Sequence, residues 1–175
     1  RKRAYHNQSF KHHFVENLES YNKAIFNNKK INIALNLDIY KAINKVNTDI
    51  IYLDPPYTGT MNDYYGFYGL IDNYISSKKI KRFKNDFMDK KKALSNFDRL
   101  FSKLKKFKYW YLSYNNHSYP TNRQIYKLLR KYSDNVKSIK KRHVYKITGK
   151  SKKQTNTEYL FIIKNLKNGK KIKKF

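Results

Sequence analysis

The chain has no cysteine, only three prolines and only five glycines among its 175 residues. The missing cysteine excludes disulfide bridges and thiolate metal sites, and it is compatible with an intracellular setting. No apolar run approaches the roughly 18 residues of a membrane span, and no apolar segment follows the basic start RKRAYHNQSF. We therefore expect a soluble chain without a membrane partner, long enough for one compact domain.

Acidic residues are also scarce: 12 Asp and Glu stand against 40 Lys and Arg, which gives a formal net charge of +28. A fold tolerates such self-repulsion best when a polyanion binds it. Codon bias in an AT-rich genome would explain the lysines, but it explains the missing acids less well. The balance therefore indicates nucleic acid as a partner, although lysine runs such as 90–92 are more often solvated surface than phosphate contacts.

Hydrophobic periodicity predicts an α/β domain. Apolar residues three and four apart predict helices, at 4–27, 39–46, 86–107 and 122–132. Alternating or unbroken apolar residues predict strands, at 31–38, 49–54 and 109–114, and an antiparallel hairpin of 140–148 with 157–163. A glycine- and tyrosine-rich loop is expected before the helix at 86. This order indicates a mostly parallel sheet with an antiparallel C-terminal edge.

Two of the three prolines stand together in Asp54-Pro55-Pro56-Tyr57, directly after the apolar strand at 49–54. Ligands collect at the carboxyl ends of parallel strands, so Asp54 has the position of an active-site residue, although a rigid turn is the alternative. The prolines remove two N–H donors, which leaves oxygen acceptors beside an aromatic ring. The complement is a planar ring with an amino group, such as adenine or cytosine. A site of this kind suits methyl transfer from a sulfonium donor to that amine.

The tetrapeptide and four further segments resemble the adenine-specific DNA methyltransferases of the Dam-like type II class. The similar segments are LNLDIYKAI (35–43), TMNDYYGFY (60–68), YWYLSYNN (109–116) and TEYLFI (157–162). The likeness runs in order over about residues 31–165. It implies a Rossmann-like methyltransferase fold and transfer from S-adenosylmethionine to the N6 amine of adenine in double-stranded DNA, with the base extruded from the helix. It also implies a bacterial, cytoplasmic restriction-modification system.

The resemblance implies roles for single residues. Asp54 and the carbonyl of Pro55 would accept from the target amine within the catalytic motif, and Tyr57 would stack on the base. The cofactor contacts implied are Asp38, Ile39, Asp54 and Tyr64. The target-base pocket implied is Tyr57, Ser113, Tyr114 and Asn115.

Plainer interpretations remain open for some of these residues. Asp38 fits a helix N-cap, Tyr64 fits a packed aromatic loop, and Asn115 fits a turn. The five histidines show no metal-binding pattern, so no metal is assigned.

Glycine is missing where the family carries it. Members have a Phe-x-Gly-x-Gly cofactor loop upstream of the motif, whereas all five glycines here follow Asp54. We therefore expect a C-terminal fragment of uncertain activity on its own, incomplete at the N-terminus. Its parts would be the end of a target-recognition region (1–30), the catalytic domain (31–165) and a basic tail (166–175). A missing N-terminal segment or a restriction enzyme is the expected partner.

Two alternative functions stay open from the sequence. One is a non-catalytic basic module that binds nucleic acid, and the other is an amino-methyltransferase that acts on RNA.

Overall fold

The computed structural model describes residues 9–56, 58, 64–79, 85–143 and 156–165. The chain forms two units, residues 1–36 and residues 37–175, and each is described by itself. The first unit contains helix α1 (Phe10–Ala24), which lies within the range expected from the sequence. The side chain of Ser9 caps α1 by accepting a hydrogen bond from the amide of His12 at 3.2 Å.

The prediction of a strand over 31–38 is wrong, because this segment has no regular secondary structure. Its alternating side chains are exposed, with Ile31 and Ile33 showing 91% and 75% of their surface. Alternation produces a strand only where a neighbouring strand accepts the backbone hydrogen bonds, and 31–38 pairs with none of the four strands of the described sheet.

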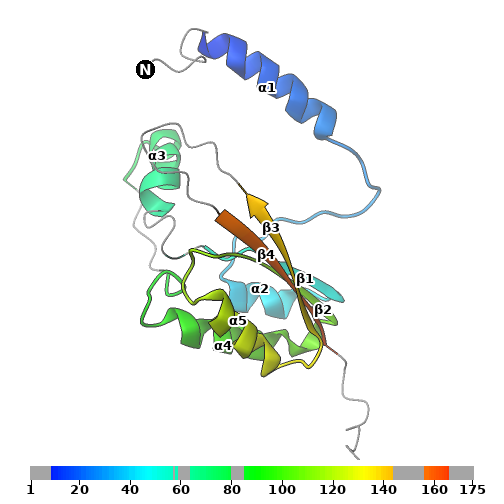
Figure 1. Cartoon of the computed structure of the whole chain (residues 1–175). Coiled ribbons are helices and arrows are strands. Elements are labelled where there is room, and N and C mark those ends of the chain that lie inside the picture. The colour runs from blue at the N-terminus through cyan, green and yellow to red at the C-terminus, as the bar shows by residue number, and fades with distance from the viewer. Residues whose placement is uncertain (1–8, 57, 59–63, 80–84, 144–155, 166–175) are drawn as a thin grey trace, which may run out of the picture. The chain divides into compact units, whose positions relative to one another are not determined.

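The second unit is built from short helices and a sheet (Figure 1). Its helices are α2 (Ile39–Lys45), α3 (Tyr64–Ser76), α4 (Ala93–Lys103) with the 3-10 turn η2 (Leu104–Lys106), and α5 (Asn122–Arg130). Its strands are β1 (Ile50–Leu53), β2 (Tyr109–Asn115), β3 (Val136–His143) and β4 (Asn156–Lys164). None of the helices in the described part of the chain is long and apolar enough to cross a membrane.

The sheet has the order β1-β2-β4-β3. Strand β1 pairs with β2 in parallel, and β4 pairs antiparallel with both β2 and β3. It follows that β1, β2 and β3 run in one direction and that β4 alone is reversed. The expected α/β class and an antiparallel C-terminal strand pair are confirmed, but the first strand of that pair is 136–143 rather than 140–148, and residues 144–148 lie outside the described residues. Direct parallel pairing among the described strands occurs only between β1 and β2.

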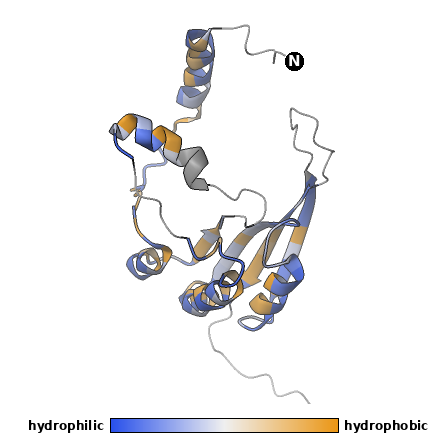
Figure 2. Ribbon diagram, turned by 90° about the vertical axis from the view of Figure 1, so that its left-hand side faces the viewer, coloured by the Kyte–Doolittle hydropathy of each residue, from blue (hydrophilic) through white to orange (hydrophobic). Residues whose placement is uncertain are grey.

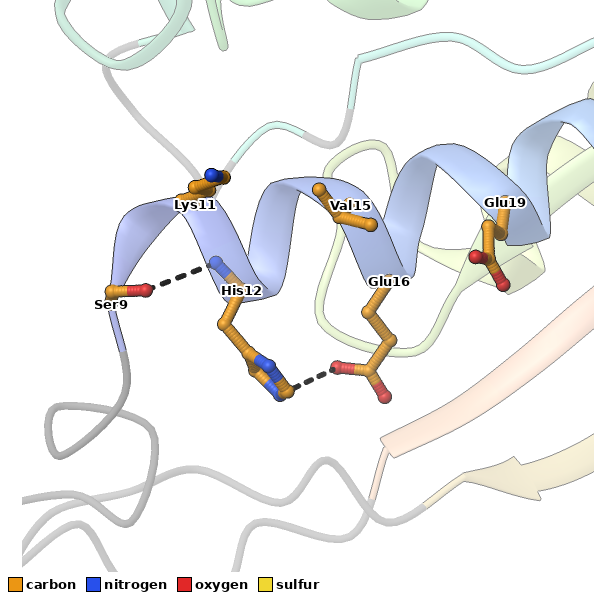
Figure 3. Close-up of a pocket in the computed structure, with 6 residues that line it drawn as sticks. All are labelled: Ser9, Lys11, His12, Val15, Glu16 and Glu19. Atoms are coloured by element: carbon orange, nitrogen blue, oxygen red, sulfur yellow. Dashed lines mark hydrogen bonds and ion pairs between the residues drawn. The ribbon is translucent and has the colours of Figure 1, made fainter.

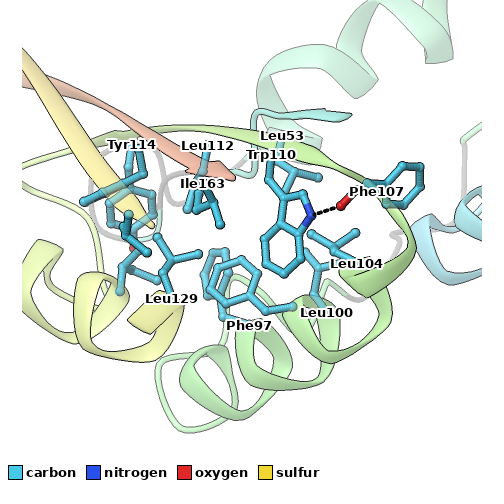
Figure 4. Close-up of a cluster of buried hydrophobic side chains, with 14 of the residues drawn as sticks. Leu53, Phe97, Leu100, Leu104, Phe107, Trp110, Leu112, Tyr114, Leu129 and Ile163 are labelled. Carbon is cyan, nitrogen blue, oxygen red and sulfur yellow. Dashed lines mark hydrogen bonds between the residues drawn. The ribbon is translucent and has the colours of Figure 1, made fainter. Parts of the chain in front are cut away.

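One face of the sheet carries the core (Figure 4). Alternate residues of the strands, such as Trp110, Leu112 and Ile163, are fully buried against α4 and α5. The indole nitrogen of Trp110 donates to the carbonyl oxygen of Phe107 at 3.0 Å, which satisfies its one polar atom. Hydrophobic residues lie along the strands and on the helices beside them (Figure 2).

Two helix boundaries differ from the expectation. Helix α4 begins at Ala93, because residues 86–92 form turns, and Phe87 instead packs edge-on against Phe97 with ring centroids 5.2 Å apart. The glycine- and tyrosine-rich loop expected after Tyr57 contains helix α3. Helix α5 begins as expected, with a capping box in which Thr121 and Gln124 bond each other's backbone amides.

Candidate active site

The carboxyl ends of β1 and β2 meet at one edge of the sheet. Leu53 lies opposite Leu112 in the parallel register, so Asp54 and Ser113 are the next residues on the two strands. Strand β2 continues to Asn115, which lies opposite Glu158 near the start of β4. The sheet topology therefore brings the predicted catalytic motif and the predicted base-pocket residues to the same edge, as expected for a ligand site between parallel strands.

The predicted catalytic motif follows the end of β1. Asp54 is exposed, and Pro55 and Pro56 are half-buried. Tyr57 lies outside the described residues. The residue after the motif, Thr58, is 3% exposed, so the chain is buried at Thr58 although Asp54 is exposed.

Thr58 is a buried residue next to the predicted motif that the sequence did not single out. Its hydroxyl donates to the carbonyl oxygen of Phe87 at 2.7 Å, and its own carbonyl oxygen accepts from the amide of Tyr119 at 3.0 Å. These contacts could not be predicted from the sequence around Thr58, because both partners are distant in sequence.

The three predicted base-pocket residues occupy different environments. Ser113 is half-buried at the sheet edge. Tyr114 points into the core (Figure 4), where its ring lies edge-on to Phe97 with centroids 6.1 Å apart. Asn115 is buried, and its side-chain oxygen accepts from the amide of His117 at 3.0 Å and from the hydroxyl of Ser118 at 2.6 Å. Tyr114 and Asn115 therefore both have clear structural roles.

The predicted cofactor residues Asp38 and Ile39 open helix α2. An oxygen of the exposed Asp38 carboxylate accepts from the amide of Tyr40 at 2.9 Å, so Asp38 is the N-cap, and Ile39 packs against the core. Burial raises the pKa of Tyr40, whose ring lies 4.3 Å from the guanidinium carbon of Arg99.

Helix α2 is held in place by a lysine from the 3-10 turn η2. The ammonium group of Lys106 donates to the carbonyl oxygens of Ile43 and Val46, the latter at 2.8 Å. These bonds satisfy carbonyls at the C-terminal end of α2, where helices leave acceptors unpaired. The remaining predicted cofactor residue, Tyr64, is the first residue of α3, and its side chain is outside the description.

A depression on α1 lies apart from these residues in the chain (Figure 3). It is lined by Ser9, Lys11, His12, Val15, Glu16 and Glu19, all from one helix and its cap. The Nε2 atom of His12 lies 3.9 Å from the Oε2 atom of Glu16 in this depression. No predicted catalytic, cofactor or base-pocket residue contributes to it. Among the described residues, no three His, Asp or Glu side chains gather as metal ligands.

Comparison with known proteins shows the relationship of the chain. The profile of the family described as "D12 class N6 adenine-specific DNA methyltransferase" matches residues 1–125. The chain is 52% identical over 165 residues to "Type II methyltransferase M2.HphI" of Haemophilus parahaemolyticus, a match that covers 94% of this chain and 49% of that protein. It is 31% identical over 163 residues to "Modification methylase StsI" of Streptococcus sanguinis, covering 85% of this chain and 24% of that protein.

The chain thus spans about half or less of the length of the curated relatives it matches. No solved structure matches it significantly. The family match includes the whole Asp54-Pro55-Pro56-Tyr57 motif and the end of β2, and it confirms the resemblance drawn from the sequence. The chain belongs to the D12 class of N6 adenine-specific DNA methyltransferases.

Proposed function

We propose that the protein acts in transferring a methyl group from S-adenosylmethionine to the N6 amine of adenine in double-stranded DNA, as the modification half of a bacterial, cytoplasmic restriction system. The observation that carries this proposal is the Asp54-Pro55-Pro56 turn at the carboxyl end of β1, beside Ser113 of β2, in a chain of the D12 family. The net charge of +28 agrees with a polyanionic substrate.

The role of Asp54 follows from its chemistry. The exposed carboxylate and the carbonyl oxygen of Pro55 can each accept one N–H of the target amine, which places the nitrogen and draws electron density toward it. Pro55 and Pro56 offer no competing donor, so the turn presents acceptors only. Tyr57 would stack on the extruded adenine, as its place in the motif implies.

S-adenosylmethionine would supply an electrophilic methyl group on its sulfonium when it is bound. We propose Asp38 and Ile39 as contacts to its adenine, with Asp54 and Tyr64 nearer its reactive end. The residues fit this role in part: the Asp38 carboxylate is exposed while it caps α2, so one group can serve the helix and a ligand. The Gly-rich loop expected of the family is not in this sequence, and we propose that it belongs to the rest of the methyltransferase.

The base pocket is proposed to use Ser113 directly and its two neighbours indirectly. Tyr114 would support the pocket from the core, and Asn115 would hold the turn at its rim.

At the level of the fold, the common direction of β1, β2 and β3 with β4 reversed supports a Rossmann-like sheet. We also propose that residues 1–30 end a target-recognition region, that 31–165 are catalytic and that 166–175 form a basic tail.

The test is calorimetric binding of S-adenosylmethionine to this chain, followed by transfer of a labelled methyl group to unmethylated DNA. Asp54→Ala should abolish transfer. Asp49→Ala is the matched control, because Asp49 is also exposed but lies at the opposite end of β1, where its backbone carbonyl, which the substitution keeps, accepts from the amides of Lys108 and Tyr109. Equal transfer by wild type and Asp54→Ala would refute the assignment of Asp54.

The second candidate function is a basic module that only binds DNA, favoured by the charge and by the missing Gly-rich loop. This candidate predicts salt-sensitive DNA binding with no affinity for S-adenosylmethionine. The calorimetric experiment separates the two functions directly.

A further inference from the structure

Thr58 is the buried polar residue next to the catalytic motif, and the reaction proposed above gives it no task. We propose that Thr58 is a positioning residue that fixes the Asp54–Tyr57 turn relative to the loop after β2. This inference rests on the proposed methyl transfer for its effect on rate, but the contacts themselves can be tested without it.

The contacts of Thr58 reach two other segments of the chain. Its hydroxyl donates to the carbonyl oxygen of Phe87 at 2.7 Å and lies 3.8 Å from the sulfur of Met88. Its carbonyl oxygen accepts from the amide of Tyr119 at 3.0 Å. A hydroxyl with 3% of its residue exposed is destabilising unless it is hydrogen-bonded, so the bond to Phe87 specifies where residue 58 lies.

The two segments that bond Thr58 are each fixed by contacts of their own. Phe87 packs edge-on against Phe97 of α4, which is buried in the core. Tyr119 follows the turn in which the buried side chain of Asn115 bonds His117 and Ser118. Thr58 therefore connects the end of the catalytic turn to the core on one side and to the end of β2 on the other.

The catalytic turn is short between its two anchors. Leu53 is fixed in the sheet opposite Leu112, and Thr58 is fixed by the bonds just described, so only residues 54–57 lie between them. Two of these four residues, Pro55 and Pro56, have φ angles fixed by their rings, which restricts the backbone at these two positions. Releasing Thr58 should let Asp54 shift relative to Ser113, and a misplacement of about 1 Å can cost about 100-fold in rate.

The experiment compares Thr58→Val, which keeps the shape and loses the hydroxyl, with Thr58→Ser, which keeps the hydroxyl, in the full-length protein. We expect Thr58→Val to lower the single-turnover rate of methyl transfer by about 10- to 100-fold at saturating DNA and cofactor. Thr58→Ser should restore most of the rate. Thr48→Val is the matched control, because the exposed Thr48 hydroxyl bonds the backbone of its near neighbour Ile50, at the other end of β1.

Hydrogen exchange supplies a readout independent of activity. The amide of Tyr119 should exchange faster in Thr58→Val than in wild type, Thr58→Ser or Thr48→Val. An unchanged transfer rate in Thr58→Val, or a loss that Thr58→Ser does not rescue, would overturn the positioning role. If wild type transfers no methyl group, the proposed function fails, and unchanged exchange at Tyr119 in Thr58→Val would then reject the positioning role separately.

Discussion

The hydroxyl of Tyr114 donates a hydrogen bond of 2.6 Å to the carbonyl oxygen of Pro120, and both residues are buried. Tyr114 lies near the end of β2, and Pro120 immediately precedes Thr121, the N-cap of α5. This one bond therefore ties the strand that carries the proposed base pocket to the helix that covers the core.

Tyr114→Phe should lower the free energy of unfolding by about 1–3 kcal/mol, because it leaves the buried carbonyl of Pro120 without its donor. Tyr111→Phe, on the opposite and more exposed face of β2, is the control and should have little effect. Urea denaturation of both variants measures the difference. Equal stability of the two variants would show that the bond does not contribute.

Asp38 can be tested for two roles at once. Asp38→Ala should destabilise α2 by about 0.5–2 kcal/mol through loss of the cap, while Asp38→Asn keeps an oxygen acceptor for the Tyr40 amide and should be close to wild type in stability. If the carboxylate also contacts the cofactor, both variants should bind S-adenosylmethionine more weakly by calorimetry. Full binding by Asp38→Asn would reduce Asp38 to a helix cap.

Asp98 should make stability depend on pH in the acid range. The ammonium group of Lys131, 2.8 Å from an oxygen of Asp98, and the hydroxyl of Tyr132 bond its carboxylate and hold its pKa below the ordinary 3.8. A group with a lowered folded-state pKa stabilises above its unfolded value and loses that contribution as pH falls through the lowered value.

We therefore expect Asp98→Asn to cost about 0.2–1 kcal/mol at neutral pH, with the difference from wild type vanishing in acid. Asp134→Asn is the control, since the Asp134 carboxylate is fully exposed and lies 3.6 Å from Arg130. Urea titrations at a series of decreasing pH values give both differences. If Asp98→Asn remains less stable than wild type in acid, the lowered pKa of Asp98 is not the cause of the difference in stability.

Lys141 and Arg142 are exposed near the end of β3, at the same edge of the sheet as Asp54, because β1 and β3 run in the same direction. We expect Lys141→Gln and Arg142→Gln each to weaken DNA binding and to lower the slope of log affinity against log salt by about 0.9. Lys103→Gln, at the opposite edge of the sheet, is the control. Fluorescence anisotropy at several salt concentrations provides the slopes. If the slopes of all three variants equal that of wild type, the DNA does not contact Lys141 or Arg142.

The strands that were correctly predicted are those that find a partner strand. The unbroken run Ile50–Leu53 and the segment Tyr109–Asn115 became β1 and β2, which pair with each other; alternate residues of β2 are buried, whereas in β1 only Leu53 is buried, and Ile50 and Tyr52 are 52% and 62% exposed. The equally regular alternation at 31–38 has no partner strand in the described sheet. Periodicity records which side chains favour burial, but the backbone pairing that makes a strand depends on residues far away in the sequence.

Glycine misled the prediction of α3. Gly66 and Gly69 suggested a loop, yet one glycine costs a helix only about 1 kcal/mol, which the surrounding residues can outweigh. The Asp54-Pro55-Pro56-Tyr57 motif could be recognised from the sequence because its residues are adjacent in the chain. Thr58 and Tyr114 could not be assigned in this way, since their bonds to Phe87 and Pro120 depend on how separate segments meet.

The position of β4 has a consequence for how the chain folds. The last of the described strands lies inside the sheet, between β2 and β3, so these two strands have no hydrogen-bonded contact until residues 156–164 arrive. During synthesis, the described sheet can therefore close only after residues 156–164 have left the ribosome. A stop codon before Asn156 should leave a nascent chain sensitive to protease, and chaperones would meet β1, β2 and β3 as an open sheet until β4 is made.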